Sequence, residues 1–201
     1  MSRKASLVKA ATMLSMIGLT AVGAATLPTS ASASGFYIGA DVVERTTDLD
    51  YLGGTETYNT SHVRIKGGYE ILKFLAVEAH VLTAGNDTDI DPSRALFELD
   101  TGNIIGIYVK PKTNFAKANV YGLIGFAQWD TTYTEVATRV KDTDTVVTFG
   151  VGVGGEFNIT KNLRFNIEGM IQSGSPSYST FFVNSPDLYS LSLAAGMSYK
   201  F

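Results

Sequence analysis

The last thirteen residues of the chain alternate between large apolar side chains and small or polar ones. The apolar set is Tyr189, Leu191, Leu193, Ala195, Met197, Tyr199 and Phe201, and between them stand Ser190, Ser192, Ala194, Gly196, Ser198 and Lys200. Because successive side chains of a strand point to opposite faces, this period of two predicts a strand with one apolar face. A single such strand fits a soluble sandwich as well as a barrel, so the fold must follow from the complete set.

Seven further segments of about 8 to 12 residues carry strand patterns, and their length is close to the roughly 9 to 11 residues of a tilted membrane-crossing strand. They are Phe36–Arg45, His62–Glu70, Leu75–Thr83, Asn103–Lys110, Asn119–Trp129, Val146–Phe157 and Leu163–Ser173. An even total of eight puts both chain ends on the same side, as in bacterial outer-membrane barrels.

The predicted links between these strands alternate in length. Short links cover 71–74, 111–118 and 158–162, whereas long links cover 46–61, 84–102, 130–145 and 174–188. Short turns on one side and long loops on the other are typical of an up-and-down barrel that spans a membrane. The sequence therefore predicts an all-β fold, a closed eight-stranded antiparallel transmembrane barrel.

The face opposite the apolar one carries small residues and a few charges. Six charged residues are predicted to fill the barrel interior: Arg64, Lys66, Glu78, Glu156, Arg164 and Glu168. Eight strands leave a lumen that side chains can fill, so these charges predict a plugged interior. The facing of strand 119–129 stays undecided, and strands 36–45 and 75–83 alternate less regularly.

Residues that pair across two neighbouring strands must point to the same side of the sheet, and this rule predicts which interior residues meet. A turn centred on Thr160 places Glu156 opposite Arg164. On strands 62–70 and 75–83, Lys66 is expected opposite or diagonal to Glu78, which brings Arg64 near His80.

The N-terminal residues have the pattern of a cleaved signal peptide. Basic Arg3, Lys4 and Lys9 precede the apolar run 10–25, and an A-x-A site follows at 31–33. We therefore predict a signal peptide over 1–33 and a barrel domain over 34–201. The remaining 13 basic and 19 acidic residues give a formal net charge of −6, which argues against nucleic acid as a partner. The chain contains no cysteine, which excludes thiol catalysis and thiolate metal sites.

Several short motifs are similar to those of a known protein family. They are 35–40 (GFYIGA), 67–69 (GGY), 75–79 (LAVEA), 120–122 (VYG) and 197–201 (MSYKF). With these motifs the sequence resembles the eight-stranded outer-membrane barrels that include opacity-type proteins, the OmpA transmembrane domain and small adhesion-linked barrels. The resemblance implies a location in the cell outer membrane, contact with its lipids and lipopolysaccharide, and an assembly signal at Tyr199 and Phe201 for the outer-membrane assembly machinery.

Two groups of residues are candidate chemical sites. His62 and His80 are the only histidines, and some barrels of this size modify lipids with serine and histidine, but spacing groups no triad here. Asp87, Asp89, Asp91 and Glu98 have the spacing of a calcium loop, although Pro92 stands where a glycine is needed. Neither pattern predicts a catalytic, cofactor or metal site, and divalent binding by the acidic loop stays open.

The leading functional hypothesis is a non-enzymatic structural or adhesion barrel with acidic surface loops, since 13 of the 19 acidic residues lie in the four long links. These loops would contact an extracellular ligand. The alternative is a narrow small-solute channel, and a lipid-modifying enzyme is the more remote one.

Deleting Phe201, or replacing it with Ser, is expected to impair assembly and leave protein in the periplasm. Fractionation of cells followed by blotting measures the distribution. Outer-membrane levels equal to those of the unaltered chain would contradict the role of Phe201 in assembly.

Overall fold

A computed structural model describes residues 35–51, 54–83, 86–87, 97–113, 115–135, 141–175 and 187–201. Its strands are β1 (Phe36–Tyr51), β2 (Gly54–Leu72), β3 (Leu75–Leu82), β4 (Asn86–Asp87), β5 (Phe97–Pro111), β6 (Ala118–Glu135), β7 (Lys141–Asn158), β8 (Leu163–Gly174) and β9 (Asp187–Lys200). The predicted signal peptide lies outside these residues, and so does its cleavage site. Among the residues described, no helix is long and apolar enough to cross a membrane.

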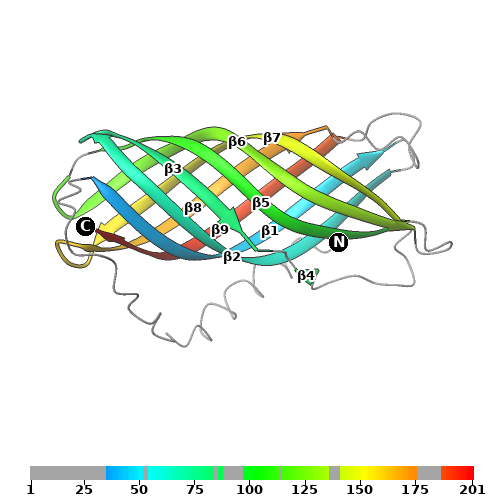
Figure 1. Cartoon of the computed structure of the whole chain (residues 1–201), viewed down its shortest axis with the longest axis horizontal. Coiled ribbons are helices and arrows are strands. Elements are labelled where there is room, and N and C mark those ends of the chain that lie inside the picture. The colour runs from blue at the N-terminus through cyan, green and yellow to red at the C-terminus, as the bar shows by residue number, and fades with distance from the viewer. Residues whose placement is uncertain are drawn as a thin grey trace. The chain divides into compact units, whose positions relative to one another are not determined.

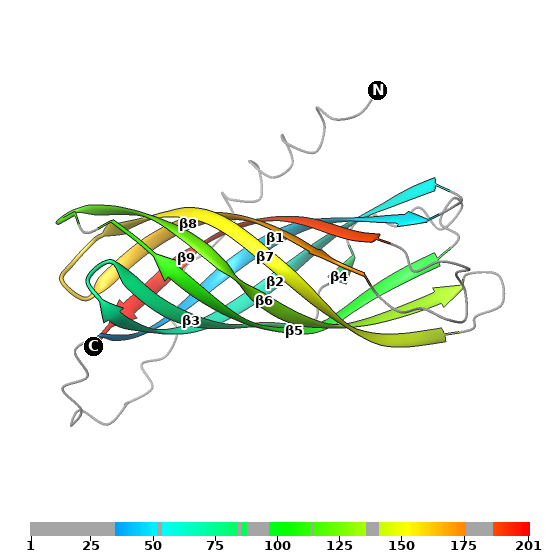
Figure 2. The same ribbon diagram turned by 90° about the horizontal axis from the view of Figure 1, so that it is seen from above.

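Eight of the strands form a closed antiparallel barrel, as predicted. Each main strand pairs with its sequence neighbours, and β1 closes the ring by pairing with both β2 and β9. Figures 1 and 2 show these strands tilted around one barrel, with the last strand beside the first. The ninth strand, β4, is a two-residue addition that pairs with Thr60 and Ser61 of β2.

Side chains alternate around the wall with the predicted parity. Large apolar residues point outward in a continuous belt, such as Ile65 of β2, Val151 of β7, Ile167 of β8 and Leu193 of β9. Their partners one residue along the strand point inward and are buried. The belt suits a hydrocarbon environment, because a barrel in lipid must place its apolar face outside.

Strand β6, whose facing the sequence left undecided, turns its odd-numbered residues inward. Tyr121, Leu123 and Trp129 are buried, whereas Ile124 and Phe126 are exposed. Both faces of this strand are therefore apolar, which explains why no clear alternation was visible in its sequence.

The short links and the long link 174–188 lie close to where they were predicted, whereas the other three long links are partly strand. Strand β1 continues to Tyr51 and β2 begins at Gly54, so most of predicted loop 46–61 is a hairpin. Strands β6 and β7 occupy 130–135 and 141–145 of another predicted loop, and β5 begins at Phe97 within a third. The loop prediction was wrong there for a physical reason. The alternation of apolar and polar residues ends where the lipid-facing belt ends, but the backbone hydrogen bonds between the strands continue beyond it.

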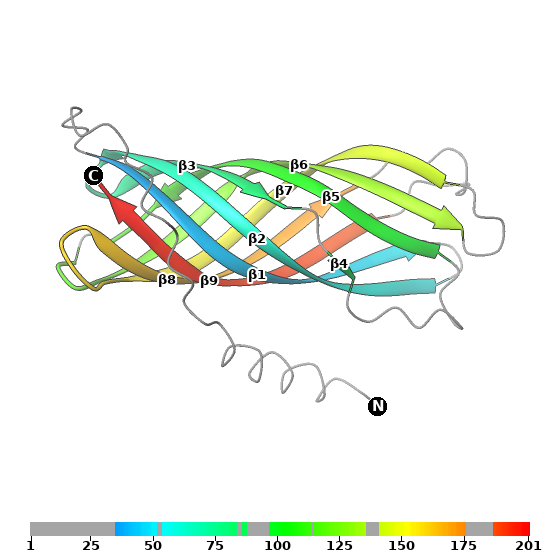
Figure 3. The ribbon, with the colours of Figure 1, turned by 60° about the horizontal axis from the view of Figure 1, so that its bottom comes forward.

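Beyond the belt, outward-facing polar residues pair across neighbouring strands. We call this region the polar collar: Glu44, Thr46, Asp48, Thr57, Asn59 and Ser61 on β1 and β2, and Asp130, Thr132, Thr143 and Thr145 on β6 and β7. Ser61 Oγ donates to Glu44 at 2.8 Å, Thr57 Oγ1 to Asp48 at 2.7 Å and Thr145 Oγ1 to Asp130 at 3.3 Å. Figure 3 shows both strand pairs running on at the end of the barrel opposite the C-terminus.

The C-terminal residue is held at the other end. The Phe201 amide donates to the Phe36 carbonyl at 3.1 Å, and the two rings lie 5.7 Å apart. Tyr199 packs edge-on against Phe201, with centroids 5.2 Å apart. Aromatic residues at a barrel end are typical of the girdle at a membrane interface. The proposed role of Tyr199 and Phe201 in assembly stays a prediction.

Placing arginine at Val151, within the apolar belt of β7, is expected to lower the free energy of unfolding by about 2 to 4 kcal/mol. Thr143→Arg is the matched control, because it lies on the same face of the same strand in the polar collar. Unfolding by urea in lipid vesicles measures both. Equal costs at the two positions would show that Val151 does not face hydrocarbon.

Candidate functional site

The barrel interior holds the charged residues, and three clusters of ion pairs fill it from the short-link end toward the middle. Every second residue of each strand points inward, so the members come both from adjacent strands and from strands far apart in the sequence. In the described interior, seven cations face five carboxylates. The cations are Arg45, Arg64, Lys66, Lys110, Lys112, Arg164 and Lys200, and the carboxylates are Asp41, Glu70, Glu78, Glu156 and Glu168.

The first cluster surrounds Asp41 of β1. Arg64 bridges two carboxylates, with Nε 2.7 Å from Asp41 Oδ2 and Nη1 2.6 Å from Glu168 Oε1. Lys66 Nζ lies 3.1 Å from the same Asp41 oxygen, and Asn166 donates to the other at 2.9 Å. The charges of this cluster are thereby paired, as buried charges must be.

The second cluster surrounds Lys110 of β5. Its ammonium group lies 2.9 Å from Glu78 Oε1 and 3.0 Å from Glu156 Oε2. It also lies 3.9 Å from the ring centroid of Tyr121, within cation–π range. The Tyr37 hydroxyl donates to Glu78, whose other oxygen is 2.9 Å from His80 Nε2.

Two glycines make room for the tyrosines of this cluster. A Cβ on Gly68 would overlap the ring of Tyr37, and one on Gly154 would overlap the ring of Tyr121. The missing side chains therefore let each ring lie over the glycine of the neighbouring strand, with the hydroxyls on Glu78 and Glu168.

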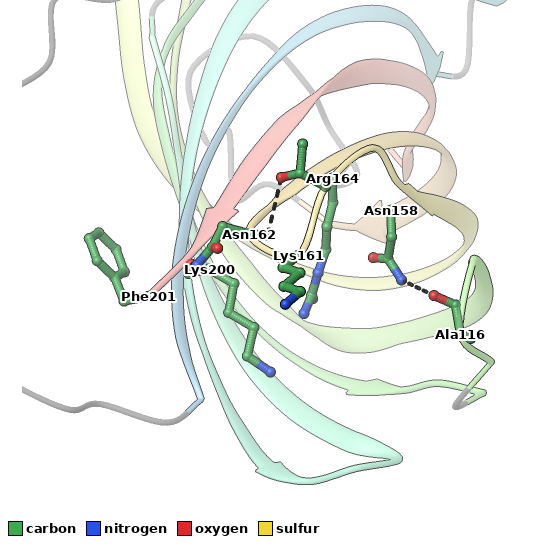
Figure 4. A pocket seen from close by; sticks show the side chains of 8 residues that line it. Ala116, Asn158, Lys161, Asn162, Arg164, Lys200 and Phe201 are labelled. Carbon is green, nitrogen blue, oxygen red and sulfur yellow. Dashed lines mark hydrogen bonds between the residues drawn. The ribbon is translucent and has the colours of Figure 1, made fainter.

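The third cluster lies at the mouth of the barrel and is centred on Glu70. Lys112 Nζ and Arg164 Nη1 approach Glu70 Oε1 at 2.6 and 2.9 Å, and Lys200 pairs with Oε2. A cavity of about 520 Å³ opens beside this cluster. In Figure 4, Lys161, Arg164 and Lys200 point into the mouth, whereas Phe201 points away from it.

All six predicted interior charges lie inside the barrel, but their partners differ in part from those expected. Lys66 is diagonal to Glu78, as predicted, yet it pairs with Asp41. Glu156 lies opposite Asn166 rather than Arg164, because the turn is centred one residue later than Thr160. The partner of Glu156 is thereby shifted by two residues along β8, and a shift of two keeps Arg164 on the inner face. Arg164 therefore still contacts Glu156 diagonally, at 3.4 Å.

Sequence reasoning missed Asp41 and Lys110, which hold two of the clusters together. Asp41 lies on the irregular first strand, and Lys110 ends a predicted strand whose inner face was not assigned. The sequence does contain a pattern that could have identified Lys110. Gly106, Tyr108 and Lys110 are alternate residues of β5, and they share the side of the strand that faces the lumen.

The two histidines have ordinary structural partners. His62 lies 2.8 Å from the Thr83 carbonyl and 2.9 Å from Thr60 Oγ1, and His80 contacts Glu78. In the described parts of the chain, no group of three histidine or acidic side chains is arranged to hold a metal ion. Asp89 and Asp91 of the candidate calcium loop lie outside those parts, whereas Asp87 and Glu98 lie in β4 and β5.

The other half of the lumen contains an apolar layer beside buried polar residues such as Arg45 and Thr60. The layer is built from Val43, Leu82, Ile104, Trp129, Val146 and Leu188, all buried. Ile104 and Val146 stand on either side of Trp129 in the sheet. Together with the ion-pair clusters, this layer packs the interior of the barrel with side chains.

A family model for the outer membrane protein beta-barrel domain matches residues 17–201. The chain belongs to this family. It is accordingly an outer-membrane protein whose apolar belt contacts membrane lipid. Barrels of this kind place their short turns in the periplasm and their longer loops outside the cell. No match was found among curated protein sequences.

Solved structures share the fold at low sequence identity. Neisserial surface protein A superposes with a TM-score of 0.64 at 16% identity, covering 84% of this chain and 98% of that one. The attachment invasion locus protein Ail of Yersinia pestis gives 0.53 at 14%, covering 84% and 99%. OprG of Pseudomonas aeruginosa gives 0.51 at 14%, covering 84% and 97%. At these identities the likeness shows the fold alone.

Replacing Lys110 with Met is expected to lower the free energy of unfolding by about 3 to 5 kcal/mol, because it leaves Glu78 and Glu156 without their shared counter-charge. Adding Glu156→Gln should restore part of that loss. Lys117→Met, on an exposed turn, is the control. Urea unfolding in vesicles measures all three, and a Lys110 variant as stable as the Lys117 variant would contradict the role of this cluster.

Proposed function

We propose that this protein is a non-enzymatic surface barrel that binds an extracellular partner through its polar collar and the adjoining segments. The observation that carries the proposal is the continuation of β1, β2, β6 and β7 beyond the apolar belt as paired, hydrogen-bonded strands with polar outer faces. A protein that only had to cross the membrane would have no need of such a projection. A rigid strand surface also loses less conformational entropy on binding than a free loop does.

The packed lumen supports this proposal over the channel alternative. Ion-pair clusters fill the periplasmic half, and the apolar layer containing Trp129 occupies much of the extracellular half. Eight strands leave little space beyond that occupied by these side chains. The proposal therefore assigns the function to the outer surface and not to a pore.

The charge of the surface favours a basic partner. The segments 46–61, 84–102, 130–145 and 174–188 contain 13 acidic residues and 3 basic ones. In the polar collar, Glu44, Asp48 and Asp130 all face outward. Opposite charge steers association and selects partners, so a cationic protein surface fits this face.

The likeness to Ail supports attachment only at the level of the fold. A structure of Ail holds the heparin analogue sucrose octasulfate. The acidic collar of the present chain would repel a polysulfate, so we expect its partner to differ from that of Ail. Heparin-coated beads should not retain the purified barrel at low salt.

Two measurements test the proposal. In planar bilayers the unaltered barrel is expected to give no steady conductance, and an open, stable current would favour the channel alternative. In an adhesion assay, bacteria that display the triple variant Glu44→Gln, Asp48→Asn, Asp130→Asn should bind human epithelial cells at least about threefold less, since each exposed ion pair contributes about 0.2 to 1 kcal/mol.

The matched control for adhesion is Thr132→Ala with Thr143→Ala. This pair removes a neighbouring hydrogen bond of the polar collar without changing its charge. Adhesion that is unchanged in the triple variant, or lowered equally in the control, would contradict recognition by the collar carboxylates.

A further inference from the structure

One buried cation of the lumen has no carboxylate partner. Arg45 of β1 is 4% exposed, and its Nη2 donates to Gln172 Oε1 at 3.0 Å. Its Nε and Nη1 atoms have no hydrogen-bond partner, and no ion pair joins it to a carboxylate of the described residues. Arginine stays protonated in proteins, so a full positive charge lies here with no carboxylate of the described residues beside it.

The neighbour of Arg45 adds another free donor. The Arg45 guanidinium lies 4.3 Å from the ring centroid of Trp129, which is 1% exposed. The indole Nε1 of Trp129 also has no hydrogen-bond partner. Three buried N–H groups on two stacked side chains are therefore unsatisfied, although buried donors in proteins are nearly always paired.

The ion pairs of the described interior set Arg45 apart from the other cations. Seven described cations face five carboxylates, and every cation except Arg45 contacts at least one of those carboxylates. Of the two excess positive charges, one lies at Arg45, and the other is shared by the cations around Glu70, Glu78 and Glu156. An arginine buried to this extent is costly unless an opposite charge accompanies it.

We propose that the extracellular half of the lumen binds one small monovalent anion of the halide class at Arg45 and Trp129. The anion neutralises the guanidinium and accepts the free N–H groups. The surroundings limit its size, because Ile104 and Val146 flank Trp129 in the sheet and both are 1% exposed. A water molecule would satisfy the donors but would leave the charge uncompensated.

The chain contains its own reporter for this site. Trp129 is the single tryptophan, so all indole fluorescence comes from the proposed anion site. Iodide quenches indole on contact. Titration of the purified barrel with iodide, at constant ionic strength made up with gluconate, should give quenching that saturates. Chloride should compete and move the curve to higher iodide concentration.

Arg45→Gln should abolish the saturable quenching, and Lys161→Gln is the matched control. Lys161 loses the same charge at the exposed periplasmic end, so its quenching curve should equal that of the unaltered chain. Acrylamide, a neutral quencher, reports access to Trp129 without charge. Unheated gel migration identifies folded barrel in each sample.

If Arg45→Gln does not fold, the anion site can still be tested on the unaltered chain. Its folded-to-unfolded ratio in urea should rise about tenfold for each tenfold increase of chloride above the dissociation constant, with gluconate as the balancing anion. Linear iodide quenching that chloride does not displace would overturn the anion site. So would stability that is the same in chloride and gluconate. Neither result depends on adhesion, so the surface proposal is tested separately.

Discussion

The structure depends on one constraint, which is that backbone N–H and C=O groups in hydrocarbon must bond to each other. A sheet meets this requirement only when its two edges meet, and here β1 pairs with β9 as well as with β2. Closure fixes the parity of every strand at once, because a slip of one residue would turn the apolar belt inward. The outward belt and the polar lumen are therefore two consequences of the same hydrogen-bond ladder.

Closure also creates the interior in which charges become energetically important. Water does not screen Arg64 or Lys110 as it would at a surface, so each contacts two carboxylates, one on an adjacent strand and one on a more distant strand. Tyr37 and Tyr121 complete these contacts, and they can do so because glycines face their rings. Function is thereby displaced from the packed interior to the projecting strands, whose pairing continues where the lipid belt ends.

The same hydrogen-bond ladder explains why sequence patterns revealed the membrane-spanning part and missed the projection. Alternation is visible where one face meets lipid and the other meets a polar lumen, as in Tyr189–Phe201. Beyond Val42 and Val63 the outer face meets water, so both faces carry polar residues such as Thr46, Asn59 and Thr60. The strands continue there because backbone pairing needs no apolar face.

By itself, the sequence determined the closed barrel and its eight main strands, through the strand patterns and the alternating link lengths. The period of two placed six charged residues on the inner face: Arg64, Lys66, Glu78, Glu156, Arg164 and Glu168. Only the tertiary structure decided which charges meet. Asp41 reaches Arg64 and Asn166 from separate strands, and Arg45 reaches Gln172 and Trp129 across the lumen. Local pattern gives the direction of each side chain, whereas its partner depends on register and on the curvature that brings distant strands face to face.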